Sequence, residues 1–305
     1  MASSPTSSLV SLSNELVALV ETSAASVVAV HGRPRFNSSG VHWSTEVVVT
    51  AEHALRHDDG VVVTTGAGDR LPAEVVGRDP GTDLAVLRVK GLAIPTVSKL
   101  EDSAYRPGNL IVAIGRNKDS ANAALGVISS LSESSQTWRG GKLDQVIRLD
   151  LALHPVAAGG AIVDAAGKLI GIATPVLSRA SVFAVPNATV ERVSRALLAH
   201  GRLPQGYLGA GLQPIRLPEH LTKGLGLSVT GGLMTVSVDQ DAPAGKAGLL
   251  IGDVLLELNS QFVDRPEAVR LLLAEAVGKT IAARVLRGGA LVTLQIAVTE
   301  RHGKD

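Results

Sequence analysis

Three stretches of this chain carry residue types that could perform covalent chemistry. His53 follows the apolar run Val47–Ala51, Asp83 follows a Pro-Gly turn, and the segment His154–Gly160 ends in two glycines. A histidine can act as a base and a carboxylate can fix its tautomer. With a hydroxyl nucleophile and two backbone N–H groups, they would support acyl transfer. The segment His154–Gly160 itself holds no hydroxyl group.

These residues also have ordinary structural interpretations. A single histidine is most often a surface residue or a satisfied core residue, and Asp83 could cap the turn at Pro80-Gly81 because aspartate favours turns. His53 and His57 are four positions apart and could share a helical face, which is one ingredient of a metal site. Since no third ligand is placed beside them, a metal-binding scaffold stays an alternative and no metal or other cofactor is predicted.

The segment from His154 to Asp164, followed by Gly171–Thr174, closely resembles the nucleophile segment of the HtrA/Deg branch of trypsin-like serine proteases. The family pattern there reads N-P-G-N-S-G-G-P-L-V-D and then a G-I-N strand. By this resemblance Ala158 occupies the position of the nucleophilic serine, and alanine has no hydroxyl with which to attack a carbonyl. Val156 occupies the position of a glycine.

Two further motifs carry the same resemblance. Thr50 and His53 match the family's T-N-N-H-V-V, and Arg78–Leu87 matches D-P-x-T-D-L-A-V-L almost letter for letter. The resemblance therefore puts His53 in the position of the catalytic base and Asp83 in that of the carboxylate that orients it. It also implies a trypsin-like double β-barrel over residues 9–201.

The resemblance further indicates where an oxyanion hole and a substrate pocket would lie. The N–H groups of Val156 and Ala158 would form the oxyanion hole. A glycine at such a turn supplies a backbone conformation that β-branched residues resist. Val156 is therefore expected to turn its amide away or to hold it under a strain of about 1–3 kcal/mol. The pocket wall would come from Ser181, Val182, Phe183 and Ala184, which suits a modest apolar side chain.

The missing serine predicts a chain without proteolytic activity, because losing the nucleophile alone typically costs about six decades in turnover. An engineered knockout would usually change the serine only, whereas Val156, Ala157, Ala158 and Ala161 all depart from the family pattern. This favours natural loss. The alternative is an active HtrA-type serine endopeptidase in which serine was replaced by alanine. Ser178 or Ser181 could in principle supply another hydroxyl, but their sequence contexts do not support that role.

A second unit follows a helix predicted over Thr189–His200 and a linker at Leu203–Gln205. The stretch Val236–Asn259 resembles the core signature of a PDZ domain, in which A-G-L and then G-D mark a helix, a turn and a strand. The resemblance implies a PDZ domain over residues 206–300.

PDZ domains bind extended peptides by strand addition, with backbone N–H groups that receive the terminal carboxylate. By resemblance, the helix Pro266–Ala276 would form one wall of the groove. The carboxylate loop would be Gly206, Tyr207, Leu208 and Gly209. A PDZ domain used only for assembly is the plainer interpretation.

Composition agrees with a mostly β chain of two domains. The chain has 305 residues, of which 45% are hydrophobic and only 2% aromatic, so its cores must be built mainly from Val, Leu, Ala and Ile. Such packing units suit β-structure. Short apolar segments separated by Gly or Pro recur from Ser26 to Pro186, after a helix predicted over Leu9–Ala25. Between them, Gly32–Gly40 is interpreted as a polar loop. The predicted fold is mostly β, a trypsin-like double β-barrel followed by a PDZ domain.

Charge, cysteine content and hydropathy restrict the partners. The net charge of +1 argues against a nucleic-acid binder or an acidic-membrane binder held by bulk electrostatics. Without cysteine there is no disulfide and no thiolate metal site. No apolar run reaches the ~18 residues of a membrane span. We expect the partners to be peptides with free C-termini or unfolded proteins, in the context of protein quality control. The resemblance allows a homotrimer.

The compartment stays open in the sequence. Met1–Ser8 is Ser-rich and lacks the basic and apolar regions of a signal peptide. Either the protein is cytoplasmic or its sequence begins after a removed leader. The family resemblance implies a periplasmic or other extracytoplasmic location.

Overall fold

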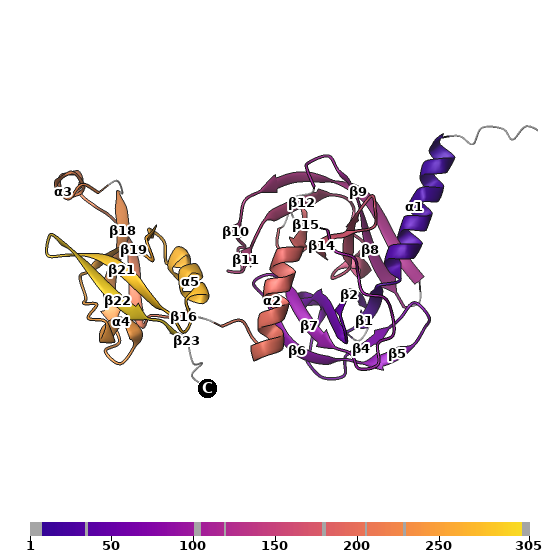
Figure 1. The fold of residues 1–305 in the computed structure, drawn as a ribbon, viewed down its shortest axis with the longest axis horizontal. Coiled ribbons are helices and arrows are strands. Elements are labelled where there is room, and N and C mark those ends of the chain that lie inside the picture. The colour runs from indigo at the N-terminus through magenta and orange to yellow at the C-terminus, as the bar shows by residue number, and fades with distance from the viewer. Residues whose placement is uncertain are drawn as a thin grey trace, which may run out of the picture. The chain divides into compact units, whose positions relative to one another are not determined.

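The computed structural model describes residues 8–33, 36–100, 105–118, 120–178, 181–204, 206–227 and 230–300. Its contacts divide the chain into an N-terminal unit that ends at Leu203 and a C-terminal unit that begins at Pro204 (Figure 1). Both units are built mainly from antiparallel strands, which confirms the prediction of a mostly β chain. Among the described residues, no helix combines the length and the hydropathy that a membrane-spanning helix requires.

The first half of the N-terminal unit is a seven-stranded sheet, here called the N-terminal sheet, with the order β5-β4-β1-β2-β3-β7-β6. Its strands are β1 (Val27–His31), β2 (Ser38–Ser44), β3 (Val47–Ala51), β4 (Val62–Thr64), β5 (Arg70–Pro72), β6 (Glu74–Asp79) and β7 (Leu84–Arg88). Strand side chains alternate between faces. Val28 and Val30 accordingly enter one buried cluster and Val27 and Val49 another, so both faces of the sheet are buried.

The second half closes into a six-stranded barrel, here called the closed barrel, with the order β12-β15-β14-β13-β8-β9. Its strands are β8 (Leu110–Asn117), β9 (Ser120–Ser132), β12 (Val146–Asp150), β13 (Ala161–Asp164), β14 (Leu169–Thr174) and β15 (Val182–Pro186), and the hairpin β10 (Ser135–Gln136) with β11 (Lys142–Leu143) follows β9. Isoleucines such as Ile111, Ile128 and Ile147 share one buried cluster. Val112 and Ile114 instead join the cluster that contains Val49, so the sheet and the barrel pack through a common core.

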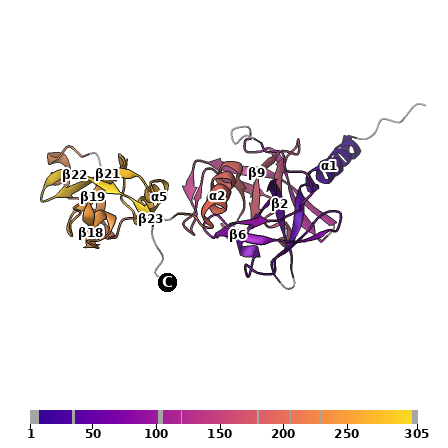
Figure 2. The same ribbon diagram turned by 60° about the horizontal axis from the view of Figure 1, so that its bottom comes forward.

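Two α-helices flank these strands. Helix α2 (Asn187–His200) packs Val193 and Leu197 into the common core and contacts β6, β7 and β14 (Figure 1); it lies beside β6 in Figure 2 as well. It ends at Gly201, which has a φ of 71° and whose N–H bonds to the Leu197 carbonyl, a left-handed C-cap that glycine adopts without steric penalty. Helix α1 (Ser8–Ala24) precedes β1, and only its last residues are buried.

Arg116 on β8 ties α1 to the closed barrel. Its guanidinium donates to the carbonyls of Ala24 at 2.5 Å and Val27 at 2.6 Å, and its side chain is buried. The last carbonyls of a helix have no partner within the helix. Arg116 thus satisfies a backbone acceptor at the helix end and gains its own hydrogen bonds inside the protein.

The expectation of a polar loop over Gly32–Gly40 was wrong, because β2 begins at Ser38. Its sequence, Ser-Ser-Gly-Val-His-Trp-Ser, lacks the apolar alternation that marks a half-buried strand. Ser39 and His42 are nevertheless buried, at 0% and 4% exposure. A strand between two packed bodies can bury polar side chains when hydrogen bonds compensate them, and periodicity cannot reveal this.

The C-terminal unit contains a six-stranded sheet with the order β17-β18-β19-β21-β22, in which β20 also pairs with β19, so β17 is an edge strand. Its elements are β16 (Gly206–Tyr207), β17 (Ala210–Arg216), α3 (Glu219–Gly224), β18 (Gly231–Val238), α4 (Pro243–Lys246), β19 (Val254–Leu258), β20 (Gln261–Phe262), α5 (Pro266–Glu275), β21 (Thr280–Arg287), β22 (Ala290–Ala297) and β23 (Thr299–Glu300). One core joins Leu208, Leu233, Leu255, Val269 and Leu273, so helix α5 covers the sheet.

A buried ion pair fixes the turn before β19. The Asp253 carboxylate is 2% exposed and accepts from the Arg287 guanidinium at 2.7 Å and from the Leu250 N–H at 2.8 Å. Burial acts to raise the pKa of Asp253. The hydrogen bonds from Arg287 and Leu250 outweigh burial and hold this pKa below its ordinary value.

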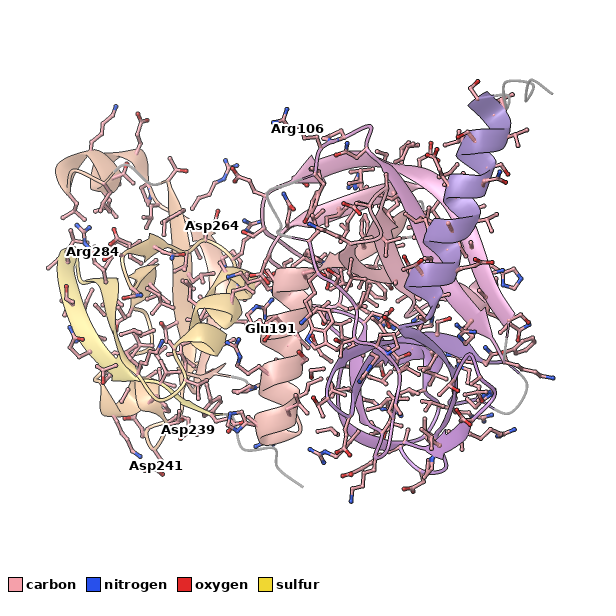
Figure 3. The ribbon with its side chains drawn as sticks, turned by 45° about the vertical axis from the view of Figure 1, so that its right-hand side comes forward. Arg106, Glu191, Asp239, Asp241, Asp264 and Arg284 are labelled. Atoms are coloured by element: carbon pink, nitrogen blue, oxygen red, sulfur yellow. The ribbon has the colours of Figure 1, made fainter. Side chains whose placement is uncertain are left out.

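This ion pair predicts an acid-sensitive C-terminal unit. Because the folded-state pKa of Asp253 is depressed, the pair stabilises the fold fully above the unfolded-state value of about 3.9. The stabilisation is lost as the pH falls from there through the folded-state pKa. Urea unfolding followed between pH 3 and 7 should show a smaller acid loss for Asp253→Asn than for the unchanged chain. Asp241→Asn, which neutralises a surface carboxylate (Figure 3), should leave the slope unchanged. Equal slopes for all three proteins would contradict the assignment.

Candidate functional site

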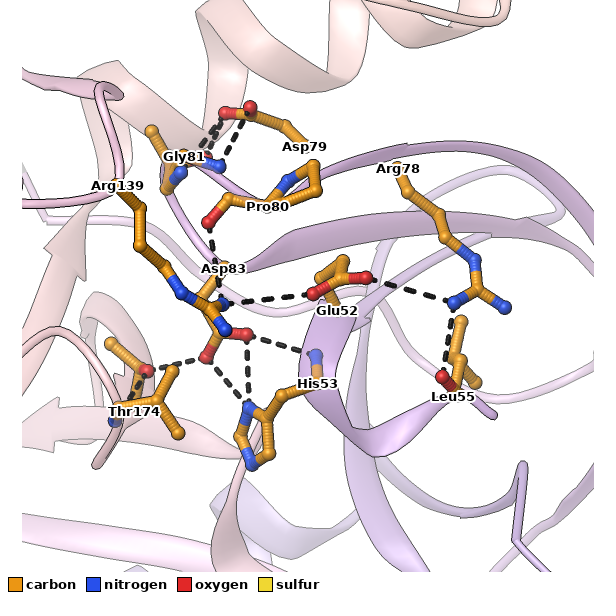
Figure 4. A network of polar contacts seen from close by, with 12 residues as sticks. Glu52, His53, Leu55, Arg78, Asp79, Pro80, Gly81, Asp83, Arg139 and Thr174 are labelled. Atoms are coloured by element: carbon orange, nitrogen blue, oxygen red, sulfur yellow. Dashed lines mark hydrogen bonds and ion pairs between the residues drawn. The ribbon is translucent and has the colours of Figure 1, made fainter. Parts of the chain in front are cut away.

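Strand pairing brings His53 and Asp83 together. Strands β3 and β7 are antiparallel neighbours in which Ala51 pairs with Leu84. His53 lies two residues after Ala51, in the 3₁₀ turn η1 (Glu52–Ala54), and Asp83 directly precedes Leu84. The Asp83 carboxylate accepts from the His53 backbone N–H and lies 2.9 Å from His53 Nδ1 (Figure 4). This contact leaves Nε2 as the histidine nitrogen that is turned away from the carboxylate.

The Asp83 carboxylate is held from both halves of the unit. The Thr174 hydroxyl, at the end of β14, donates to Asp83 Oδ2 at 2.5 Å, and the Asp83 side chain has no solvent exposure. Asp83 also has a φ of 59°, an uncommon conformation for a residue with a side chain. Sequence reasoning missed Thr174, although it stands at the end of the Gly-Ile-Ala-Thr strand that carried part of the resemblance.

A charged network surrounds the residue before His53. The Glu52 carboxylate lies 3.7 Å from an Arg78 nitrogen and 3.8 Å from an Arg139 nitrogen (Figure 4). Arg78 also donates to the Leu55 carbonyl at 2.9 Å. Arg139 comes from the turn between β10 and β11, so the network connects the His53 turn to the hairpin that follows β9.

The expectation that His53 and His57 share a helical face was wrong. The turn η1 ends at Ala54, and Leu55 is extended with φ −99° and ψ 121°. Side chains four positions apart align only on a continuous helix. Among the described residues, no three His, Cys, Asp or Glu side chains are grouped so that they could hold a metal ion.

Ala158 lies beside the histidine turn, where the resemblance places a nucleophile. It follows the 3₁₀ turn η2 (Pro155–Ala157), is 3% exposed and forms a small buried cluster with Ala51 and Ala54. Gly159 comes next, with a φ of 78°, and a Cβ there would lie 2.4 Å from the Ser39 carbonyl oxygen. Only glycine fits this position, so the backbone frame of the nucleophile turn is present without its hydroxyl.

The two amides assigned to an oxyanion hole are both engaged within their own loop. Val156 donates to Nδ1 of His154 at 3.3 Å, and Ala158 donates to the Pro155 carbonyl at 3.3 Å. Val156 is not among the described non-glycine residues with positive φ, so its backbone is not held in a left-handed conformation. Its amide is turned towards His154 instead. Neither N–H group is free to receive an oxyanion in this structure.

Ser39 on β2 clamps this closed loop. Its N–H donates to the Ala158 carbonyl at 2.9 Å, and its hydroxyl donates to the Val156 carbonyl at 2.5 Å and accepts from the Arg116 N–H at 2.8 Å. Sequence reasoning does not find Ser39, because the expected loop over Gly32–Gly40 includes it, and it gives His154 no role, because the family pattern assigns none to that position.

The residues assigned to a substrate-pocket wall divide into two pairs. Phe183 and Ala184 on β15 have their side chains in the buried clusters of the N-terminal unit. Ser181 and Val182 are partly exposed. Only the latter pair has side-chain surface with which to contact a ligand.

In the C-terminal unit, the loop before β17 presents unused backbone donors. The carbonyls of Leu208 and Gly209 accept from Ala244 and Asp239, each at 2.8 Å, whereas in the described part of the chain their N–H groups have no acceptor. Gly209 has a φ of 74°, and a Cβ there would meet the Ala242 Cβ at 2.0 Å. Two free N–H groups at a loop whose conformation requires glycine can receive an anionic oxygen.

Helix α5 and strand β17 both adjoin this loop. Leu273 in the last turn of α5 lies against Gly206, since a Cβ on Gly206 would be 2.2 Å from the Leu273 carbonyl oxygen. Helix α5 contacts β17, whose outer edge has no partner strand. The partly buried apolar side chains of β17 and α5 that pack against the core are Ala210, Leu212, Ala268 and Leu272.

Comparisons with known proteins match both units. Residues 38–172 match the trypsin-like peptidase domain family, and residues 206–298 match the PDZ domain family. A probable periplasmic serine endoprotease, DegP-like, of Brucella suis is 29% identical over 278 residues, covering 88% of this chain and 53% of the relative. The serine protease Do-like HtrB of Bacillus subtilis is 31% identical over 271 residues, covering 83% of this chain and 59% of HtrB. The chain thus spans little more than half the length of these curated relatives.

Solved structures agree over nearly the whole chain. The HtrA-type protease AlgW with a tripeptide has a TM-score of 0.74 and 30% identity, and the match covers 94% of this chain and 98% of AlgW. AlgW with a decapeptide has a TM-score of 0.75 and 28% identity, with 94% and 99% of the two chains covered. The serine endoprotease from Yersinia pestis has a TM-score of 0.72 and 27% identity, with 98% and 100% covered.

Proposed function

Because this chain belongs to the HtrA family of proteases, with a trypsin-like domain followed by a PDZ domain, we propose that it binds peptides or unfolded polypeptides without hydrolysing them. The observation that carries the proposal is Ala158, which has no nucleophilic atom and stands beside the histidine turn. Hydrolysis through a covalent acyl intermediate needs such an atom. The closed loop around Val156 supports the same conclusion, since an oxyanion hole requires free donors.

The PDZ unit supplies the proposed binding function. The free N–H groups of Leu208 and Gly209 and the open edge of β17 are what strand addition by a peptide with a free C-terminus requires. The structural neighbour AlgW was solved with a decapeptide and with a tripeptide. We assign the degenerate protease domain to residues 9–201 and the PDZ domain to residues 206–300.

The proposal also includes the location and the oligomeric state of the protein. Curated relatives are named periplasmic, and we propose an extracytoplasmic location for this chain as well. A homotrimer is proposed on family resemblance. Crosslinking and sedimentation of the purified chain would test the oligomer.

Incubation of the chain with an unfolded protein such as reduced casein should give no cleavage products above background. The physical reason is that the side chain of Ala158 is a methyl group, which has no hydroxyl proton that His53, oriented by Asp83, could remove. A hydrolytic activity that a covalent serine inhibitor blocks would overturn the proposal.

The alternative is an active HtrA-type endopeptidase whose serine was replaced by alanine. Determining codon 158 in the natural gene decides between the two, because a serine codon would support the endopeptidase. A metal-binding scaffold, the second alternative, lacks the helical face it relied on, since η1 ends before His57.

A further inference from the structure

The open edge of β17 lacks one of the backbone donors that a ligand strand would use. The N–H of Leu217, just after β17, donates to the Thr230 carbonyl on the side of β18. Backbone donors in a strand alternate between its two edges, so the donor position of Pro214 falls on the open edge. Proline has no N–H, and β17 therefore offers a ligand a backbone donor at Leu212 but none at Pro214.

A hollow of about 360 Å³ lies at the end of β17 that contains Pro214. It is lined by Pro214, Arg216, Phe262 and Asp264, among other residues. Asp264 lies on the segment that leads into α5 (Figure 3), two residues before the first helical residue, Pro266. The last turn of α5 lies against Gly206. The hollow is thus at the opposite end of β17 and α5 from the loop with free N–H groups.

The two charged side chains at this hollow, Asp264 and Arg216, differ in whether they have an ion-pair partner. Asp264 lies 3.4 Å from the guanidinium of Arg265, so its charge is partly neutralised. The side chain of Arg216 is exposed and makes no ion pair with any described residue. Phe262, at 40% exposure, provides an apolar wall beside it. An unpaired guanidinium next to an apolar wall suits a carboxylate carried on a short aliphatic stem.

The length of β17 fixes which ligand residue reaches the hollow. The strand has seven residues, from Ala210 to Arg216, and a strand rises about 3.3 Å per residue. A peptide whose last residue pairs near Ala210, antiparallel to β17, brings a residue about six positions earlier opposite Arg216. A tripeptide would end well before the hollow.

We propose that the hollow at Arg216 and Phe262 is a subsite for an acidic side chain about six residues before the free C-terminus of a bound peptide. The subsite rests on the proposed peptide-binding function and adds a chemical specificity to it. The backbone donors before Pro214 anchor the C-terminal end of the ligand, and Arg216 selects charge beyond them.

The test uses the full chain and decapeptides that differ only in the sixth to eighth residues from the C-terminus. Three peptides carry Glu, Gln or Lys at these positions, and fluorescence anisotropy measures their dissociation constants. An exposed charge pair contributes little because water screens it, so the Glu peptide should bind only about two- to fivefold more tightly than the Lys peptide. The difference should shrink in high salt. In Arg216→Glu the order should reverse, and in Arg270→Glu, an exposed arginine outside the hollow, it should stay.

The remaining measurements distinguish a failure of the proposed subsite from a failure of the proposed peptide-binding function. A tripeptide with the same C-terminus should bind the unchanged chain and Arg216→Glu equally. If decapeptides bind through their carboxylate but Glu, Gln and Lys versions bind alike in all three proteins, the subsite is wrong and peptide binding stands. If no peptide binds, or amidated and free peptides bind equally, both proposals fail.

Discussion

Replacing Ala158 by serine alone is expected to give at most about one hundredth of the proteolysis that Ala158→Ser combined with Val156→Gly gives. The new hydroxyl would stand beside the turn of His53, whose Nδ1 is already oriented by Asp83. The oxyanion donors would still be engaged, however, and each such donor is worth about 10²–10³ in turnover.

The size of this expected difference follows from one peptide plane. The peptide bond between Pro155 and Val156 engages both oxyanion donors. Its carbonyl, from Pro155, accepts from the Ala158 N–H, and its N–H, from Val156, points to His154. Turning it over would free both amides. That rotation changes the φ of residue 156 by about 180°, from the negative value of a 3₁₀ turn to a positive one. Glycine adopts such a value without cost, whereas a β-branched valine resists it.

Hydrolysis of an unfolded protein substrate by the two single variants and the double variant measures the effect. The double variant should exceed the product of the single effects, because the parts of such a site act as a unit. Val156→Gly alone serves as the control and should stay inactive. Activity of Ala158→Ser equal to that of the double variant would show that the loop opens without help from residue 156, and would favour an engineered loss of the serine.

Amidating the C-terminus of a bound peptide is expected to weaken its binding to the C-terminal unit by about ten- to a hundredfold. The free N–H groups of Leu208 and Gly209 would lose a charged acceptor. Hydrogen bonds to charged groups contribute about 1.5–3 kcal/mol each. Titration calorimetry with a free and an amidated version of one peptide measures the difference.

Two glycine substitutions make the experiment specific. Gly209→Ala should abolish the preference for the free carboxylate, because its Cβ would meet Ala242 at 2.0 Å and its φ of 74° disfavours a side chain. Gly224→Ala is the matched control, since a Cβ there has open space and φ is not positive. Equal affinities for the free and amidated peptides in the unchanged chain would refute the carboxylate loop.

The parts of the site that could be predicted from sequence are those fixed by local strand context. His53 and Asp83 each adjoin an apolar strand, and the pairing of β3 with β7 places them together. The helix α2 and its glycine stop were predictable for the same reason, as apolar spacing and a C-cap are local signals.

The parts that could not be predicted depend on contacts between the N-terminal sheet and the closed barrel. Thr174 donates to the carboxylate of Asp83, which precedes a strand of the other half, and Ser39 donates to a loop more than one hundred residues away. Neither has a local pattern that marks it. The supposed pairing of His53 with His57 failed because the length of a 3₁₀ turn depends on its tertiary surroundings and not on the spacing of two side chains.

The three hydrogen bonds of Ser39 also bear on how the N-terminal unit comes apart. They join a strand of the N-terminal sheet to a loop and a strand of the closed barrel, at a residue with no solvent exposure. Thr174 crosses the same boundary to reach Asp83. Neither half can lose its structure while these bonds persist, so sheet and barrel should denature in a single cooperative transition. Any rearrangement of the loop at Val156 must therefore weaken the contacts that hold the N-terminal sheet and the closed barrel together.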